Sequence, residues 1–321
     1  MQKPIVVVGS INLDLVVGAD RIPQVGETII GNSFNTFYGG KGANQAVAVA
    51  KLGYPASMVG NVGNDAFGAQ LRRGMEDAGV DTSYVNKMEG ASGVALITTG
   101  RHGENNIVVV PSANSLLTPE LLEKATPLLE RAGFILAQLE IPLETVDSLA
   151  QFAERHDIPL MLDPAPACEL SGALLRRVSW ITPNETETQE LLKTDIGNGE
   201  QGYDAAAERL LACGVKNVLL KLGSRGSVIV QRNLKNQHVP AFAVNAVDTT
   251  AAGDAFNGGF AVGLMRGLTV ARSAVFASAV AAISVTRPGA QSSMPTGDEV
   301  ERFLEQRSIA TAQAPSYSKQ A

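Results

Sequence analysis

The chain has 321 residues, of which 45% are hydrophobic and 18% charged, enough for one large α/β domain or two ordinary ones. Its formal net charge of −6 argues against a nucleic-acid or anionic-membrane partner, because either would require a basic face. The cysteines and histidines lack the spacing of a zinc site or a disulfide framework, and the first apolar run, 5–9, is too short for a signal peptide or a membrane span. We therefore expect a cytoplasmic protein without nucleic-acid or membrane partners.

Apolar runs of strand length alternate with helical patterns through most of the chain. The strand-like runs are 5–9, 57–63, 134–140, 160–166, 178–184, 218–223 and 227–230. The helical patterns among them are 43–53, 66–79, 142–156 and 203–214. Such alternation is typical of parallel βαβ units. The sequence therefore predicts an α/β fold with a mostly parallel central sheet flanked by helices.

Two stretches, 15–38 and 93–110, break this order. They alternate apolar and polar residues and contain turn residues, a pattern typical of antiparallel hairpins. We expect them to form a small β-sheet lid separate from the parallel sheet. The whole is predicted to be one domain over 1–305, followed by a tail, 306–321, whose lack of periodicity predicts disorder.

The stretch VDTTAAGDAFNGGF (247–260) contains two carboxylates, Asp248 and Asp254, and leads into a helix predicted to begin near Ala251. First-turn amides have no partner within a helix and can form an anion site; here they belong to Ala252, Gly253 and Asp254. A carboxylate there would repel a bound anion. It is well placed, however, to accept a proton from a hydroxyl that attacks a phosphoryl group held by those amides. The alternative is that Asp254 simply caps the helix.

Two earlier stretches carry polar groups near predicted strand ends. In FYGGKGANQAVAVAKLG (37–53), paired glycines run into an amphipathic helix and allow backbone amides to approach a ligand, although an ordinary tight turn is the alternative. The stretch fits neither the GxxxxGK[ST] nor the GxGxxG motif, which leaves a nicotinamide oxidoreductase little support. In GSINLDL (9–15), Asn12 and Asp14 share one face of an extended segment and suit the hydroxyls of a polyol; a solvated turn is the alternative.

Three later stretches have weaker signals. In TPNETE (182–187), Asn184 and Glu187 share a face if a helix starts there, though acids also favour a helix start for its dipole alone. KLGSRGS (221–227) is a glycine turn that either borders a nucleotide or links two strands. SVTRPGAQSS (284–293) is a loop rich in hydroxyls and carbonyls.

The order of GSINLD, GGKGANQA, AQLEIP, DPAPA, TPNETE, LGSRG and VDTTAAGDAFNGG along one chain resembles the ribokinase/PfkB family of sugar kinases over residues 4–305. GGKGAN and DTTAAGD match the family's two signature regions. The resemblance implies ATP-dependent phosphorylation of D-ribose at its 5-hydroxyl, with Mg²⁺ as cofactor, K⁺ as activator and a homodimer formed through the β lid. Two alternatives stay open: a kinase for 2-deoxyribose, another pentose or a nucleoside, and a non-catalytic sugar-binding protein.

The resemblance also implies roles for individual positions. Asp254 matches the catalytic base, and the anion hole matches Ala251, Ala252 and Gly253. The sugar pocket matches Asn12, Asp14, Gly40, Lys41, Asn44 and Glu140, together with Asp254. The nucleotide side matches Asn184, Lys221, Gly223, Ser224, Gly226, Gly253 and Ser278, with Glu187 organising the water shell of Mg²⁺. The K⁺ site matches Asp248, Thr250, Ser284, Arg287, Gly289 and Ser293. Many family members have glycine at position 251, a difference that matters only if this position needs a positive φ.

Overall fold

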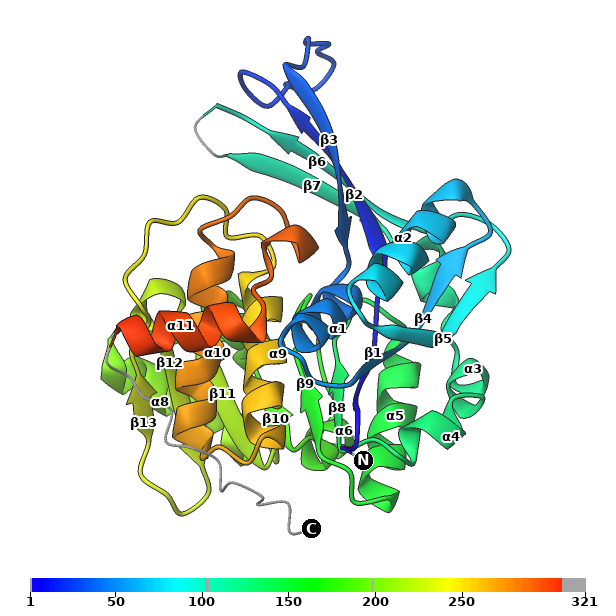
Figure 1. The fold of residues 1–321 in the computed structure, drawn as a ribbon. Coiled ribbons are helices and arrows are strands. Elements are labelled where there is room, and N and C mark those ends of the chain that lie inside the picture. Colours follow the sequence, from blue (N-terminus) through cyan, green and yellow to red (C-terminus); the bar gives the residue numbers. More distant parts are fainter. Residues whose placement is uncertain (1, 102–103, 198, 308–321) are drawn as a thin grey trace, which may run out of the picture.

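The computed structural model describes residues 2–101, 104–197 and 199–307 (Figure 1). Gln306, which the sequence analysis assigned to the tail, is instead the last residue of helix α11 (Gly297–Gln306). The rest of the predicted tail, from residue 308, lies outside the described residues.

The large sheet has nine strands in the order β13-β12-β11-β10-β9-β8-β1-β4-β5. Their bounds are β1 (Ile5–Val8), β4 (Ala56–Gly63), β5 (Asp81–Met88), β8 (Phe134–Ala137), β9 (Leu160–Leu162), β10 (Trp180–Ile181), β11 (Asn217–Lys221), β12 (Ser227–Gln231) and β13 (Gln237–Val239). The pairs β11–β12 and β12–β13 are antiparallel and the other pairs are parallel. The predicted mostly parallel sheet is therefore confirmed.

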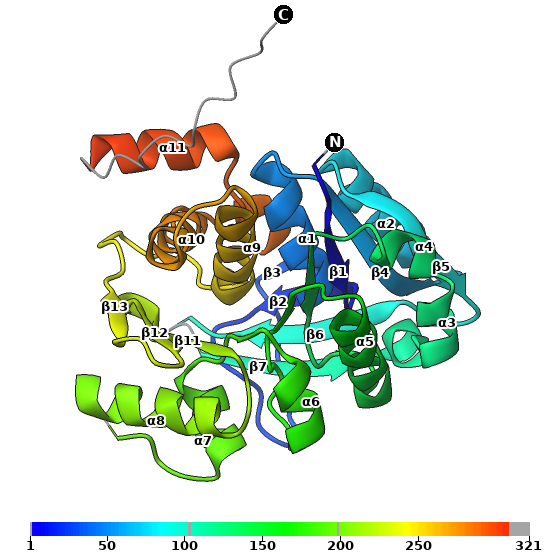
Figure 2. The same cartoon turned by 90° about the horizontal axis from the view of Figure 1, so that it is seen from below.

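Helices cover both faces of this sheet (Figure 2). One face carries α1 (Lys41–Lys51), α2 (Ala66–Asp77), α9 (Ala252–Met265), α10 (Val270–Ser284) and α11. The other carries α3 (Pro119–Glu123), α4 (Thr126–Leu129), α5 (Leu143–Arg155), α6 (Gly172–Arg177), α7 (Glu185–Leu192) and α8 (Glu200–Ala212). Strand β1 shows why two cores form: Ile5 and Val7 pack into the first, and Val6 and Val8 into the second.

A separate four-stranded sheet, here called the small sheet, projects from the body of the molecule (Figure 1). It contains β2 (Asn12–Gly18), β3 (Ser33–Gly39), β6 (Gly93–Thr99) and β7 (Asn105–Val110) in the order β3-β2-β6-β7. The pairs β2–β3 and β6–β7 are antiparallel, whereas β2 and β6 run parallel and join the two chain segments. Because β2 begins at Asn12, the side chains of Asn12 and Asp14 are carried by the small sheet itself.

The carboxyl ends of the central parallel strands converge on one region. The sheet is built outward in both directions from β1, toward β4 on one side and β8 on the other. Ligands of open α/β sheets bind in the crevice at such a reversal. Ser10, Gln138 and Asp163 follow β1, β8 and β9 almost immediately, so polar groups gather at this edge.

Candidate active site

Asp254 lies in the first turn of α9, with only 5% of its surface exposed. One carboxylate oxygen accepts a hydrogen bond from Asn44 Nδ2 (2.9 Å) and the other from Gln45 Nε2 (3.1 Å), both on α1. The two helices approach closely at Gly258, where a Cβ would lie 2.7 Å from the Cβ of Ala48. A glycine in the middle of α9 therefore lets α1 carry its amide side chains up to Asp254.

The residue before α9, Ala251, has a left-handed conformation with φ 58° and ψ 15°. This conformation costs an L-residue about 1–2 kcal/mol, whereas glycine adopts it readily. The departure from glycine at this position therefore matters, because the backbone does require a positive φ.

The amides that follow Ala251 form the predicted anion site only in part. The Ala252 amide donates to the carbonyl of Thr249 (3.2 Å), so it is engaged within its own turn. In the described part of the chain, the amides of Gly253 and Asp254 have no hydrogen-bond partner. These two amides, at the positive end of the helix dipole, are the donors available to an anion.

Burial raises the pKa of Asp254 to about 6, and the nearby Asp163 carboxylate adds to the rise. The Lys41 ammonium and the hydrogen bonds from Asn44 and Gln45 act in the opposite direction. A carboxylate with this pKa is ionised at neutral pH yet basic enough to accept a proton from a substrate. The structure therefore gives Asp254 the properties of a general base.

Four carboxylates surround Lys41, the first residue of α1. Burial lowers the pKa of its ammonium, but the charges of Asp254, Asp163, Glu140 and Glu187 outweigh burial and raise that pKa overall. Lys41 is therefore charged, and it is the cation that links the predicted sugar side of the site to the predicted nucleotide side.

The predicted sugar residues lie around this centre. Glu140 accepts hydrogen bonds from Ser10 Oγ and from the Lys41 amide (3.3 Å). Burial raises the pKa of Asp14 to about 7, with the charges of Glu140 and Asp254 contributing. Gly40 has φ +87°, and a Cβ there would lie 2.7 Å from the amide nitrogen of Asn12, so the glycine turn packs against the start of β2. The buried Asn44 Oδ1 has no donor among the described residues and is free to accept a sugar hydroxyl.

On the nucleotide side, Asn184 and Glu187 form a capping box at the start of α7. Asn184 Oδ1 accepts from the Glu187 amide (2.8 Å), and Glu187 Oε2 accepts from the Asn184 amide (2.7 Å). The two residues therefore cap the start of α7. Burial nevertheless raises the pKa of Glu187, and the charges of Lys221, Asp163 and Lys41 all reach it, so its carboxylate faces the same site.

The turn at 221–226 lies beside this capping box, since Asn184 and Lys221 form a parallel bridge. Gly223 and Gly226 have φ values of 56° and 94°, as the tight turn requires, and Ser224 lies between them. The Lys221 ammonium forms an ion pair with Asp163 Oδ1 at 2.9 Å. It also lies close to Gly253, since a Cβ added to that glycine would be 3.4 Å from the ammonium nitrogen. The turn therefore delivers a positive charge next to the two free amides. Ser278 is buried in α10. Among the described residues, it makes no hydrogen bond to the capping box or to the 221–226 turn.

The predicted cation residues lie on two adjoining segments, the loop at 248–250 and the stretch that runs from Ser284, the last residue of α10, to Ser293. Asp248 accepts from the amide of Thr250 (2.9 Å) and from the amide of Gly289 (2.8 Å), which ties the two loops together. Burial raises the pKa of Asp248, but the hydrogen bonds that its carboxylate accepts outweigh burial and lower the pKa overall. The other polar groups bond locally: Arg287 pairs with Glu299 (2.6 Å), Ser284 Oγ donates to the Ala281 carbonyl and Ser293 Oγ to that of Ala290.

Five polar residues of the site were not predicted: Ser10, Gln45, Asn114, Gln138 and Asp163. Asn114 Nδ2 donates to Asn12 Oδ1 (2.7 Å) and holds that side chain in place. Gln45 and Asp163 lie within GGKGANQA and DPAPA, so the motifs signalled both positions without signalling a role. Ser10 and Gln138 likewise lie within GSINLD and AQLEIP, whereas Asn114 is buried in a segment with no motif to mark it.

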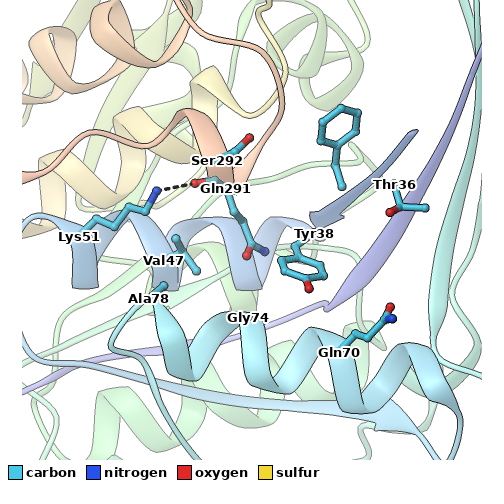
Figure 3. Close-up of a pocket in the computed structure, with 10 residues that line it drawn as sticks. Thr36, Tyr38, Val47, Lys51, Gln70, Gly74, Ala78, Gln291 and Ser292 are labelled. Carbon is cyan, nitrogen blue, oxygen red and sulfur yellow. Dashed lines mark hydrogen bonds between the residues drawn. The ribbon is translucent and has the colours of Figure 1, made fainter. Parts of the chain in front are cut away.

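A cavity of about 500 Å³ lies elsewhere, where α1, α2 and β3 meet residues 291–292 (Figure 3). Its lining includes Tyr38, Gln70 and Lys51, whose ammonium donates to the Gln291 carbonyl at 2.9 Å. None of the predicted site residues lines it. This cavity is therefore separate from the candidate site around Asp254.

The doubly covered α/β sheet, the buried carboxylate at a helix N-terminus and the neighbouring free amides define a phosphotransferase for hydroxyl acceptors. Residues 2–297 match the model of the family described as pfkB family carbohydrate kinase. The chain belongs to this family, whose members phosphorylate sugar hydroxyls.

Individual relatives cover nearly the whole chain. The ribokinase of Haemophilus influenzae is 39% identical over 95% of this chain and 99% of its own length. The deoxyribokinase of Salmonella typhi is 38% identical over 94% and 98%. The solved structure of Arabidopsis thaliana ribokinase complexed with ribose and ATP has a TM-score of 0.90 and 35% identity, over 95% of this chain and 99% of that one. Among the described residues, no helix is long and apolar enough to cross a membrane.

Proposed function

We propose that this protein transfers the γ-phosphoryl group of ATP to the 5-hydroxyl of D-ribose, as a cytoplasmic kinase. The observation that carries the proposal is Asp254, a buried carboxylate next to the free amides of Gly253 and of its own backbone. The similarity to ribokinases over nearly the whole chain supports ribose as the acceptor.

In the proposed reaction, the oxygen of the sugar 5-hydroxyl attacks the γ-phosphorus of ATP, and ADP leaves. Asp254 accepts the proton of that hydroxyl. The two free amides and the Lys221 ammonium face the charge on the phosphoryl oxygens. In phosphoryl transfer the protein mainly positions the reactants and neutralises charge, so preorganised donors at this point lower the barrier.

Two cations belong to the proposal. Mg²⁺ bound with the nucleotide phosphates neutralises their charge, and the Glu187 carboxylate would hold its water shell, since Mg²⁺ is usually bound through few carboxylates and several waters. K⁺ would lie between the two loops that Asp248 joins, at 248–250 and 284–293. The first of these loops leads directly into Ala251 and α9, and the second is tied to it by the Gly289 amide, so an ion there would fix the shape of the anion site.

The closest alternative acceptor is 2-deoxyribose, which the similarity to a deoxyribokinase favours. Asp14 is the residue we assign to the 2-hydroxyl, since a carboxylate pairs well with sugar hydroxyls. Its side chain shares the sheet face of Asn12, next to Glu140. Loss of that hydroxyl would leave a buried carboxylate without its partner, which costs far more than a lost apolar contact.

We also propose a homodimer formed through the small sheet. The register places Val17, Phe34, Tyr38, Leu96, Val108 and Val110 on one face, opposite to that of Asp14. Each of them is more than a third exposed. A contiguous apolar face of this kind calls for a cover, and a second copy of the same sheet supplies one.

The test is an ADP-release assay with Mg-ATP and D-ribose, 2-deoxyribose, fructose or adenosine, each with K⁺ or Na⁺ as the only monovalent cation. We expect the highest kcat/KM with ribose, and stimulation by K⁺ that is lost in Asp248→Ala. A higher kcat/KM for another acceptor would keep the mechanism and replace the substrate. No turnover with any acceptor would instead favour a sugar-binding protein.

A further inference from the structure

Two buried carboxylates, Asp254 and Asp163, approach each other from different parts of the fold. They are 5% and 3% exposed, and the charge of Asp163 disfavours ionisation of Asp254. Asp163 is compensated by the ammonium of Lys221 at 2.9 Å. Among the described residues, Asp254 has no cation at hydrogen-bond distance; its ionised form is favoured by the more distant charge of Lys41 and by hydrogen bonds from the neutral donors Asn44 and Gln45.

Gln45 is the donor that the two carboxylates share. Its Nε2 lies 3.1 Å from Asp254 Oδ1 and 3.1 Å from Asp163 Oδ2, so its two amide hydrogens serve one carboxylate each. The side chain is 1% exposed and cannot reach solvent or substrate from this position. Its amide nitrogen therefore holds the two acids relative to each other.

The orientation of the Gln45 amide is fixed from behind. Gln138 Nε2, at the end of β8, donates to Gln45 Oε1 at 2.9 Å, so a flipped Gln45 would set donor against donor and its oxygen against two carboxylates. Gly9, at the end of β1, makes room for Gln138: a Cβ on Gly9 would lie 2.0 Å from Gln138 Oε1. A continuous row of contacts thus runs from the β1 strand end to the base.

We propose that Gln45 is a positioning residue of the phosphoryl transfer, which orients the Asp254 carboxylate and couples it to the Asp163–Lys221 pair beside the anion site. The inference rests on the proposed function for its catalytic meaning. Through it, the proton acceptor and the cation nearest the phosphoryl position share one rigid set of hydrogen bonds.

The test is Gln45→Met, which keeps the length of the side chain and removes both donated hydrogen bonds. The other groups that face Asp254 remain: Lys41 and Asn44 from α1, Asp163 from the end of β9 and, through its charge, Asp14 from β2. We expect the acid limb of the kcat profile, measured at saturating ribose, to move about one unit toward higher pH, because Asp254 loses a donor that favours its ionised form. The kcat at pH 7 should fall on the order of 10- to 100-fold through misplacement of the base and should recover partly at pH 9, with the KM for sugar unchanged.

The matched control is Gln151→Met, on α5, where an exposed glutamine donates to the half-buried Asp147. It should leave the profile unchanged. Gln138→Met, one step further from the base, should give a smaller shift in the same direction, and it replaces Gln45→Met if that variant does not fold. An unmoved acid limb in both variants, or a loss of kcat that is equal at every pH, would overturn the proposal.

A second measurement separates this inference from the proposed function. The carboxyl ¹³C signal of Asp254, assigned by its absence in Asp254→Asn, can be titrated in the substrate-free protein. Its midpoint should rise in Gln45→Met and stay in Gln151→Met. If the wild-type protein turned over no sugar, the proposed function would fail, whereas this titration would still decide whether Gln45 holds Asp254 in its ionised form.

Discussion

Replacement of Asp254 by asparagine should abolish most of the activity while making the protein more stable at alkaline pH. The pKa of this carboxyl is raised from 3.8 to about 6. At 1.36 kcal/mol per unit, its ionisation in the folded state costs about 3 kcal/mol. An acid with a raised folded pKa stabilises the fold below its unfolded pKa, and that contribution is lost as the pH rises through the folded value. For Asp254 the loss develops from pH 3.8 to just above 6.

Asparagine carries no charge, so the variant does not lose this stability as the pH rises. It also replaces one carboxylate oxygen with an NH₂ donor. This donor would face the amide donor of either Asn44 or Gln45, and such a mismatch costs about 1–3 kcal/mol. The net change at pH 8 is therefore between zero and a gain of about 2 kcal/mol. Because the mismatch is the same at every pH, it does not affect how the stability difference between variant and wild type changes with pH. From pH 5 to pH 8, the stability of the variant relative to wild type should rise by about 1 kcal/mol.

The assay is chemical denaturation of both proteins at pH 5 and pH 8, together with kcat at pH 8. We expect kcat to fall about 10²- to 10⁴-fold, as for the loss of a general base. Asp163→Asn is the control, because it breaks a buried ion pair and should destabilise the protein at pH 8 by about 3–5 kcal/mol. A stability difference between Asp254→Asn and wild type that does not change with pH would refute the account of a buried, ionised base.

Three further outcomes follow from the structure. Ala251→Gly should stabilise the protein by up to about 1 kcal/mol with activity retained, because relief of the left-handed strain exceeds the added freedom of the unfolded chain; a lower melting temperature would contradict this. The KM for ribose should fall as the pH rises from 6 to 8, since Asp14, with a pKa of about 7, accepts hydroxyl hydrogen bonds best when ionised; Asp14→Asn should make the KM independent of pH over this range, and a persistent slope would assign it to another group. Leu96→Glu should turn the dimer into a monomer in sedimentation experiments, with Leu234→Glu, exposed away from the small sheet, as control; a dimer in both variants would place the interface elsewhere.

Some elements were predictable because their patterns are local. The buried strands β1, β4 and β8 and the helices α1, α2 and α5 begin within a few residues of the predicted positions, since continuous apolar runs and amphipathic periodicity mark them. The run 160–166 was less accurate: β9 ends at Leu162, and the chain leaves the sheet at Asp163, next to Pro164. The edge strands β5 and β13 were not predicted, because their mixed polar residues resemble loops.

By itself, the sequence determined the α/β class, the separate small sheet and the helix start that carries Asp254, because periodicity, turn residues and helix-start chemistry act over a few positions. Only the tertiary structure decided which donors reach that carboxylate. Gln45 meets Asp163 across 118 positions and Asp254 across 209, contacts that no local pattern encodes. The raised pKa of Asp254 was equally beyond sequence reasoning, because it arises from burial and from charges that the packing of α1, α9 and the strand ends brings together.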